Sequence, residues 1–345
     1  MSDISKPVVS FDNVSIVFGN KPQAALPLMD EGKTREDIQE ATGQVLGVHD
    51  CSLDVGEGEI VVLMGLSGSG KSTLLRAVNG LNPVVRGNVI VRDGDWSCDP
   101  AACNAADLRK LRRECVSMVF QQFGLLPWRT VLENVAFGLE LAGVPEAKRR
   151  EQAQTQLELV NLQAWGERKV HELSGGMQQR VGLARAFATD APILLMDEPF
   201  SALDPLIRNR LQDELLDLQR SLNRTIVFVS HDLDEAVKLG SRIAIMEGGR
   251  IVQIGTPQEI ILKPADDYVA DFVAHMNPLS VLRARDVMRP AANGRSADAG
   301  PSIGADATLR EAFALAGQSE GAIAVTENGA VLGEIDRAAL VQALA

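Results

Sequence analysis

The fold of this chain is indicated first by Gly65-Leu66-Ser67-Gly68-Ser69-Gly70-Lys71-Ser72, which fits the pattern GxxxxGK[ST]. Before it, residues 59–65 (EIVVLMG) form a short apolar run, which is typical of a fully buried strand in a parallel sheet. After it, residues 72–79 have a helical pattern. A phosphate-binding loop requires this context, a glycine-rich turn between a strand and a helix. The sequence therefore predicts an α/β nucleotide-binding fold rather than a glycine-rich turn without a ligand.

This loop supplies the groups that hold the phosphates of ATP. Its glycines let backbone N–H groups turn inward, and the helix that begins near Lys71 points its positive end at the phosphates. We expect Lys71 to reach the β- and γ-phosphates and the Ser72 hydroxyl to ligate Mg²⁺. The candidate phosphate-binding residues are Gly65, Leu66, Ser67, Gly68, Ser69, Gly70, Lys71, Ser72 and Thr73.

Polar residues follow two further apolar runs that are predicted to be strands. Asp197 and Glu198 follow residues 193–196, and His231 follows residues 225–229. In a parallel α/β sheet, ligands gather beyond the carboxyl ends of the strands. We therefore expect Asp197 to hold Mg²⁺, Glu198 to activate the attacking water as general base, and His231 to lie near the γ-phosphate as a third catalytic residue.

A glutamine follows a fourth apolar run in the same way. Gln121 comes directly after residues 116–120, so its amide is a candidate contact for the metal or the attacking water. Gln122 is adjacent, and the sequence alone leaves open which of the two matters. With Ser72 and Asp197, Gln121 completes the predicted metal site.

A second phosphate-binding segment is indicated by the sequence LSGGMQQR at residues 173–180. It precedes a helix predicted over residues 178–189, and a serine hydroxyl, exposed backbone N–H groups and a helix N-terminus together form an anion site. The chain thus has two such helix ends but one phosphate-binding loop. If they lie apart within one chain, a head-to-tail homodimer brings them to one ATP. The residues that would serve the neighbouring subunit's ATP are Ser174, Gly175, Gly176, Met177 and Gln178.

These motifs occur in the order seen in ATP-binding-cassette (ABC) ATPases, which the chain resembles over residues 8–265. The resemblance implies a P-loop NTPase with a RecA-like core and an α-helical subdomain over residues 125–185. It also implies that Ser201 and Asp204, in the segment SALD, communicate across the dimer. Phe18 matches the aromatic residue that stacks on adenine, although a core-facing Phe18 is the alternative, because a long insert follows it.

Three stretches resemble the ATPase subunits of importers for quaternary amines, such as glycine betaine, proline betaine and choline, with the choline-transporting members the most similar. They are the insert at residues 19–46, the sequence GVHDCSLDVGEGEI at residues 47–60, and the sequence GLLPWRTVLENVAFGLEL at residues 124–141. The resemblance implies membrane-embedded permease subunits, contacted by residues 123–131, and a periplasmic or surface substrate-binding protein. It places the chain on the cytoplasmic face of the membrane. The alternatives are import of an amino acid, polyamine or sulfonate, and a non-transport ABC ATPase.

Composition further limits the partners and the cellular location expected for this chain. The formal net charge of −12 disfavours broad binding to nucleic acid or anionic lipid. The four cysteines form no CxxC pair, which favours free thiols in a reducing compartment. No run of about 18 apolar residues predicts a membrane span, and residues 1–9 lack the pattern of a signal peptide. We therefore expect any permease to be a separate chain.

The last part of the chain predicts a second domain. Its composition changes after Pro278, and residues 291–305 are rich in Ala, Gly and Ser, as a linker would be. We expect an ATPase domain over residues 1–277 and a small α+β module over residues 278–345, with a hairpin turn at Asn328-Gly329. This module resembles one CBS module, whereas relatives often carry two that pack as a pair. A homodimer would bring two single modules together.

Overall fold

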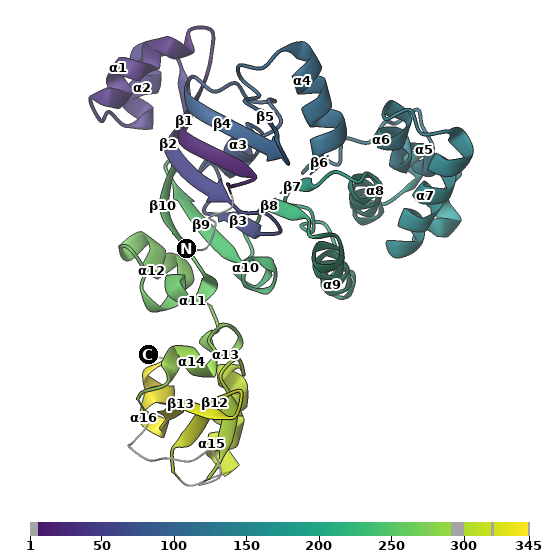
Figure 1. The fold of residues 1–345 in the computed structure, drawn as a ribbon. Helices are drawn as coiled ribbons and strands as arrows, with labels where there is room; N and C mark the ends of the chain where they lie inside the picture. Colours follow the sequence, from purple (N-terminus) through teal and green to yellow (C-terminus); the bar gives the residue numbers. More distant parts are fainter. Residues whose placement is uncertain (1–5, 275, 291–299, 319–320, 344–345) are drawn as a thin grey trace. The chain divides into compact units, whose positions relative to one another are not determined.

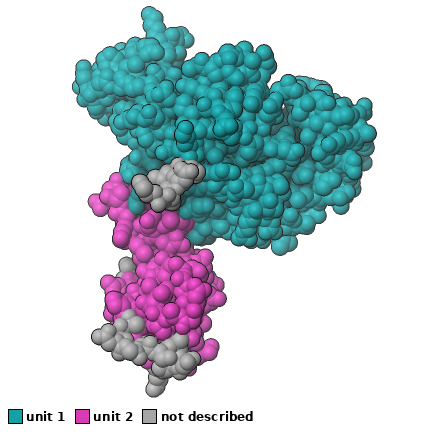
Figure 2. Space-filling model, in the orientation of Figure 1, with its two compact units in different colours: residues 1–254 teal, residues 255–345 magenta. Residues whose placement is uncertain are grey.

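The computed structural model describes residues 6–274, 276–290, 300–318 and 321–343. Two compact units divide between residues 254 and 255 (Figure 2). This division places residues 255–277 with the second unit, whereas the boundary at 277/278 rests on the change in composition after Pro278 and remains a prediction. Most of the expected linker, residues 291–299, lies outside the described residues. In the part of the chain that is described, no helix combines the length and the apolar character needed to cross a bilayer.

The first unit contains a six-stranded sheet in the order β10-β9-β3-β8-β7-β6 (Figure 1). The neighbours β9-β3, β3-β8, β8-β7 and β7-β6 are parallel, and every side chain of β3, β7 and β8 is buried. This burial explains why these strands are continuous apolar runs, and it confirms the predicted parallel sheet. The strands are β3 (Ile60–Met64), β6 (Val116–Val119), β7 (Ile193–Asp197), β8 (Thr225–Val229), β9 (Arg242–Glu247) and β10 (Arg250–Gly255).

A second, antiparallel sheet has the order β2-β1-β4-β5, and half of it was not predicted. The alternating pattern of residues 8–18 and the strand-like pattern of residues 48–56 predict β1 (Val9–Phe18) and β2 (Val45–Val55), whereas β4 (Arg86–Asp93) and β5 (Trp96–Cys98) were missed. The pattern of β4 is weak because its apolar run is only three residues long, with polar residues on both sides: Arg86 and Asn88 before it, and Arg92 and Asp93 after it. The expectation of one mostly parallel sheet was therefore wrong for this part. Buried side chains of both sheets meet in one core.

The insert after β1 folds into a 3₁₀ turn (Pro22–Ala25) and the helices α1 (Leu26–Asp30) and α2 (Arg35–Thr42), which lie beside the antiparallel sheet (Figure 1). The short helix predicted here is confirmed. Thr34 and Asp37 form a reciprocal capping box at its start, an arrangement that stabilises a helix by about 1 kcal/mol. Ile38 packs with Val17, Ala25, Met29 and Leu46 in a separate small core.

The predicted helical subdomain is present at the opposite end of the first unit (Figure 1). Residues 131–141 have the pattern of one helix, but the structure divides this helix at Ala136. The helix that follows the phosphate-binding loop ends at Leu75 rather than at Asn79. The helices of the subdomain are α5 (Val131–Val135), α6 (Phe137–Leu141), α7 (Glu146–Leu159) and α8 (Gly175–Phe187). The other helices of this unit are α3 (Lys71–Leu75), α4 (Ala105–Lys110), α9 (Pro205–Leu222) and α10 (Leu233–Leu239).

The second unit has its own core beneath a three-stranded sheet in the order β11-β12-β13. The predicted hairpin is confirmed, with Asn328 and Gly329 at φ +49° and +82° between β12 (Ile323–Glu327) and β13 (Ala330–Ile335). The short strand β11 (Ser302–Gly304) was missed. The helices are α11 (Pro257–Leu262), α12 (Asp267–Val273), α13 (Pro278–Val281), α14 (Ala284–Val287), α15 (Leu309–Gln318) and α16 (Arg337–Gln342).

Candidate nucleotide-binding site

The parallel sheet brings the predicted site residues to one edge. Leu63 of β3 and Asp197 of β7 both pair with Val229 of β8, and Val119 of β6 pairs with Met196. The carboxyl ends of four adjacent strands therefore lie in a row. The phosphate-binding loop, His231, Glu198 and Gln121 follow these ends, which is why residues far apart in sequence meet here.

Close packing beneath the phosphate-binding loop requires its glycines. A Cβ atom on Gly65 (φ +139°) would lie 2.1 Å from the carbonyl oxygen of Met246, and one on Gly70 (φ +100°) would lie 2.6 Å from that of Gly47. Lys71 is buried inside the loop, and its Nζ donates hydrogen bonds to the carbonyls of Gly65 and Leu66, both at 2.8 Å. Burial lowers the pKa of Lys71, although the carboxylates of Glu198 and Asp197 oppose this effect.

Asp197 lies fully buried behind the loop, between two donors. The Ser72 hydroxyl donates to its Oδ1 at 2.6 Å, and Nη2 of Arg76 donates to its Oδ2 at 2.7 Å. Sequence reasoning missed Arg76, which compensates the buried charge; its spacing of four residues from Ser72 on the helical segment was the available signal.

This pair of oxygens suits Mg²⁺, a hard cation that proteins hold through one or two carboxylates or hydroxyls together with the phosphates of a substrate. The Ser72 hydroxyl oxygen and Oδ1 of Asp197 lie 2.6 Å apart, so both are close enough to reach one cation. Across the described residues, no group of three or more His, Cys, Asp or Glu side chains is arranged to hold a metal ion without such phosphates. The residues present therefore fit a cation that arrives with its nucleotide.

The side chains of Gln121, Glu198 and His231 lie together, with the Glu198 carboxylate between the other two. Gln121 donates from Nε2 to Oε2 of Glu198 at 3.2 Å, and Nδ1 of His231 lies 3.6 Å from the same oxygen. Of the two adjacent glutamines, the structure thus brings Gln121 to the site. Glu198 has a positive φ of +49°, a strained value for a residue with a side chain, and strain of this kind concentrates at functional sites.

The loop and these three side chains line one pocket of about 740 Å³. Phe18 also lines this pocket and is 39% exposed, so it is not a core side chain. Its ring lies over Gly47, where a Cβ atom would come within 2.8 Å of the ring and 3.1 Å of the Thr73 methyl group. Six of the nine predicted loop residues line the pocket: Ser67, Gly68, Gly70, Lys71, Ser72 and Thr73.

The segment LSGGMQQR is placed elsewhere in the first unit. Ser174 caps α8 and accepts a hydrogen bond from the backbone N–H of Met177 at 3.4 Å, so the helix starts at Gly175, three residues earlier than predicted. Ser174 and Gly175 are exposed. Within residues 6–274, none of Ser174, Gly175, Gly176, Met177 and Gln178 lines the pocket that holds the phosphate-binding loop.

A buried glutamine links this helix to the loop after β7. Gln179 is 1% exposed; its Nε2 donates to the carbonyl of Glu198 at 3.1 Å, and its Oε1 accepts from the N–H of Ala202 at 3.0 Å. Sequence reasoning missed Gln179, because nothing in the motif separates it from its polar neighbours. Of the predicted communication residues, Ser201 donates to the Glu198 carbonyl at 3.1 Å, and Asp204 is the exposed cap of α9.

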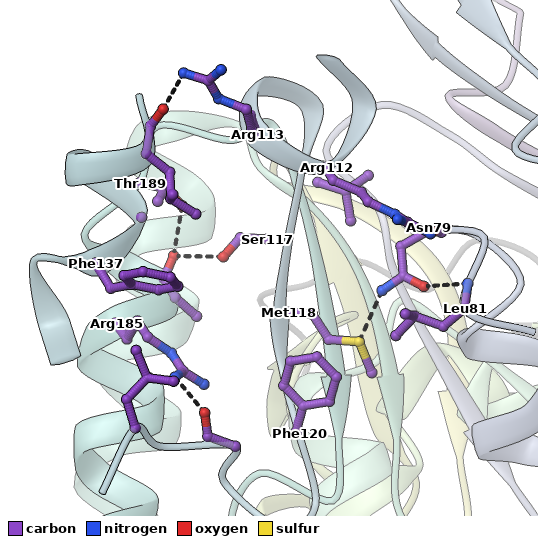
Figure 3. A pocket seen from close by; sticks show the side chains of 16 residues that line it. Asn79, Leu81, Arg112, Arg113, Ser117, Met118, Phe120, Phe137, Arg185 and Thr189 are labelled. Atoms are coloured by element: carbon purple, nitrogen blue, oxygen red, sulfur yellow. Dashed lines mark hydrogen bonds between the residues drawn. The ribbon is translucent and has the colours of Figure 1, made fainter. Parts of the chain in front are cut away.

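A second pocket, a groove of about 360 Å³, lies between β6 and the helical subdomain. Figure 3 shows Phe137 and Arg185 on one side of it and Met118 and Phe120 on the other. Arg185 donates to the carbonyls of Phe123 and Gly124, both at 2.7 Å, and so holds the segment after Gln121. The groove therefore has apolar and aromatic walls around a fixed loop.

The fold and the site together define a P-loop ATPase with a helical subdomain. A family model described as ABC transporter matches residues 48–201. The glycine betaine/proline betaine transport system ATP-binding protein ProV of Escherichia coli is 52% identical over 282 residues, covering 82% of this chain and 70% of that protein. The chain belongs to the ABC transporter family of ATP-binding, ATP-hydrolysing subunits.

Two further comparisons extend this result. The trimethylamine N-oxide transport system ATP-binding protein TmoW of Ruegeria pomeroyi is 45% identical over 338 residues, covering 98% of this chain and 97% of that protein. The dimeric structure of MJ0796, a bacterial ABC transporter cassette, superposes with a TM-score of 0.62 at 29% identity, covering 72% of this chain and 98% of that one. These matches confirm the predicted ABC ATPase fold, with ATP as the nucleotide and Mg²⁺ as its usual cation.

Proposed function

We propose that this chain is the ATP-hydrolysing subunit of an importer for a small methylated amine. One observation supports the ATPase activity above all. The phosphate-binding loop, Gln121, Glu198 and His231 line a single pocket at the edge of the parallel sheet. A nucleotide in this pocket would have its γ-phosphate beside a carboxylate, which is the arrangement that hydrolysis requires.

In this mechanism, the backbone N–H groups of the loop and Lys71 bind the phosphates, and the Ser72 and Asp197 oxygens hold Mg²⁺. Bound Mg²⁺ offsets the charge that develops on the phosphate oxygens. Glu198 accepts a proton from the attacking water, while Gln121 and His231 keep its carboxylate oriented. Phe18 supplies the face on which adenine stacks.

The proposed working unit is a head-to-tail homodimer. Ser174, Gly175 and Gly176 would contact the ATP held by the neighbouring subunit's loop, and Ser201 and Asp204 would lie at the interface. Support comes from the exposure of this segment and its separation from the pocket in one chain. The dimeric structure of the related cassette MJ0796 gives the precedent.

The groove of Figure 3 is the proposed contact with the permease. Its aromatic walls would accept a short helix from a membrane-embedded subunit, close to the segment that follows Gln121. Motion of the helical subdomain on ATP binding would then reach the permease directly. In the proposed system the chain lies on the cytoplasmic face of the membrane, and a periplasmic or surface substrate-binding protein completes the system.

Two cargo classes are supported by specific relatives. Glycine betaine and proline betaine are named for the 52% identical relative, which supports a quaternary amine and keeps choline in the same class. Trimethylamine N-oxide is the second candidate, because the relative named for it aligns with nearly the whole of this chain. Both cargoes carry methyl groups on a nitrogen, and neither is expected to contact this subunit.

The test is uptake of radiolabelled glycine betaine, choline and trimethylamine N-oxide by cells with and without this subunit. We expect uptake of one methylated amine to depend on the wild-type chain and to be lost with Lys71→Ala. Dependence of amino-acid or polyamine uptake instead would contradict the proposed cargo.

For the second unit we propose that two single modules pair in the homodimer. Leu332 and Val341 are large apolar side chains at 41% and 64% exposure, and pairing would bury them. Val341→Glu in the full chain is expected to weaken dimerisation and change ATPase regulation. Sedimentation and ATPase rates identical to wild type would contradict the pairing.

A further inference from the structure

One arginine of the insert between β1 and β2 joins two parts of the nucleotide pocket. Arg35, the first residue of α2, lines the same pocket as Phe18 and the phosphate-binding loop. Its Nη1 donates a hydrogen bond to the carbonyl of Gly68 at 2.9 Å, and its Nη2 donates to the carbonyl of Gly47 at 2.5 Å. Gly68 belongs to the phosphate-binding loop, whereas Gly47 belongs to β2. The guanidinium therefore connects the loop to the antiparallel sheet.

Glycines leave the space that this guanidinium occupies. A Cβ atom on Gly249, in the turn between β9 and β10, would lie 2.4 Å from Nη2 of Arg35 and 3.0 Å from the carbonyl oxygen of Gly47. A Cβ atom on Gly70 would lie 2.6 Å from the same oxygen. The N–H of Gly249 also donates to the carbonyl of Ser69 at 3.1 Å. Arg35 thus lies where β2, the phosphate-binding loop and the β9–β10 turn meet.

The other end of this connection lies at the ring proposed to stack on adenine. The Phe18 ring packs against Gly47, where a Cβ atom would come within 2.8 Å of it. Arg35 therefore contacts the backbone at both places that a bound nucleotide would touch, the phosphate-binding loop and the support of the ring. A ligand that spans two such places binds more tightly when their separation is fixed beforehand, because less freedom is lost on binding.

The surroundings of Arg35 are otherwise unfavourable for a guanidinium. Its Nε is buried and has no hydrogen-bond partner among the described residues. Loss of hydration lowers the pKa of Arg35, and the neighbouring Glu36 carboxylate opposes this effect. Because an unpaired buried donor costs stability, the contacts to the two carbonyls must offset that cost.

We propose that Arg35 is a positioning residue for nucleotide binding: through the carbonyls of Gly68 and Gly47 it fixes the phosphate-binding loop relative to the Phe18 ring. Arg35 contacts backbone groups and none of the residues around Glu198, so it acts on the affinity for ATP and not on the rate of hydrolysis. This inference rests on the proposed ATP pocket and deepens it, because it gives the insert between β1 and β2 a role in binding.

The test uses the full chain and measures the dissociation constant for ATP by calorimetric titration, and KM and kcat from steady-state ATPase rates. Arg35→Ala is expected to raise Kd and KM about tenfold, as the loss of one or two ordinary hydrogen bonds would, with kcat within about twofold of wild type. Arg35→Lys keeps the positive charge and a donor but not the planar fork, so its Kd should rise only about threefold.

A second arginine that attaches the insert supplies the matched control. Arg86 of β4 donates from Nη1 and Nη2 to the carboxylate of Asp30 on α1, at 2.5 and 2.9 Å, and neither residue lines the pocket. Arg86→Ala therefore loosens the insert without touching the pocket, and it should keep the wild-type Kd and KM.

A second ligand separates positioning from charge. Inorganic tripolyphosphate with Mg²⁺ can occupy the phosphate-binding loop but has no base to reach Phe18. In Arg35→Ala its affinity should fall about twofold, against about tenfold for ATP, because it does not depend on the separation of the two places. Equal losses for both ligands would show that only the positive charge of Arg35 matters, and would overturn the positioning role.

Other outcomes would also overturn it: an unchanged Kd for ATP in Arg35→Ala, or equal losses in Arg35→Ala and Arg86→Ala. No ATP binding by wild type would instead overturn the proposed pocket itself. Thermal unfolding shows whether each variant is folded. If Arg35→Ala is not, Arg35→Lys decides, and a wild-type Kd in that variant would contradict the proposal.

Discussion

The two phosphate-binding segments of this chain differ in how completely one subunit builds them. The loop after β3 is enclosed: Lys71 is buried, and carbonyl oxygens from neighbouring strands pack against Gly65 and Gly70. The segment at the start of α8 is open, since Ser174 and Gly175 are exposed and lie outside that pocket. One segment is enclosed by its own subunit, whereas the other is proposed to need a neighbouring subunit.

Contacts made by α8 also explain how the two phosphate-binding segments could communicate. Gln179 lies one turn into α8 and contacts the backbone on both sides of the loop that carries Glu198. A phosphate bound at the start of α8 would therefore act on Glu198, the proposed base of the same subunit. Glu198 in turn contacts Gln121, which lies 77 residues earlier in the sequence. In the proposed dimer, the open segment would therefore couple the two sites.

The largest expected effect concerns the enclosed site. Glu198→Gln removes the general base and is expected to reduce ATP hydrolysis at least about 10³-fold while trapping a closed, ATP-loaded dimer. Steady-state ATPase rates and size-exclusion chromatography with ATP measure both outcomes. Glu247→Gln, an exposed carboxylate at the end of β9, is the control. Wild-type turnover in Glu198→Gln would refute the assignment of the base.

Loss of the buried lysine is expected to weaken ATP binding itself. Lys71→Ala removes a positive charge from a desolvated loop, so the dissociation constant for ATP should rise about 100-fold. Lys148→Ala, which removes an exposed lysine of α7, should bind like wild type. Calorimetric titration distinguishes the two, and tight ATP binding by Lys71→Ala would remove the loop from the site.

Substitution at the open segment should separate binding from closure. Ser174→Arg is expected to bind ATP with nearly wild-type affinity, since Ser174 lies outside the pocket, but to hydrolyse it about 30-fold more slowly because the dimer cannot close. Ser174→Ala, which loses only the helix cap, should lose much less activity. A large loss of ATP affinity in the isolated subunit would show that the segment acts within its own chain.

The smallest effect is expected at the link between the two segments. Gln179→Ala breaks the contacts to Glu198 and Ala202 and should lower kcat about fivefold with little change in KM. Gln179→Glu keeps the acceptor for the Ala202 N–H and should recover part of the rate. An equal loss in both variants, accompanied by an equal fall in Tm, would indicate a packing role alone.

Sequence patterns predicted those strands and site residues whose positions depend on the local spacing of apolar and polar residues. The apolar runs of β3, β7 and β8 are buried on both faces, so their composition alone identified them and placed Asp197, Glu198 and His231 at the sheet edge. The resemblance to ABC ATPases supplied the helical subdomain and the position of Phe18.

What depends on contacts between distant segments could not be predicted. Arg35 lies in a polar insert and reaches the loop only because the packing of Ile38 turns α2 toward it. Arg76 and Gln179 are ordinary helix residues until the fold brings Asp197 and the Glu198 backbone to them. The strand β4 was missed because its apolar run is short and lies between polar residues, and only pairing with β1 extends the strand beyond that run.

The central claim is that Ser174, Gly175 and Gly176 complete the site of the neighbouring subunit. It is tested most directly by mixing two defective chains, one with Lys71→Ala and one with Ser174→Arg, both in the Glu198→Gln background, and measuring occluded ATP per dimer. If the segment acts in trans, both defects fall in one site of the mixed dimer and the other site is intact, so the account predicts one occluded ATP. Neither variant alone should retain any. No occluded ATP in the mixed dimer would contradict the account.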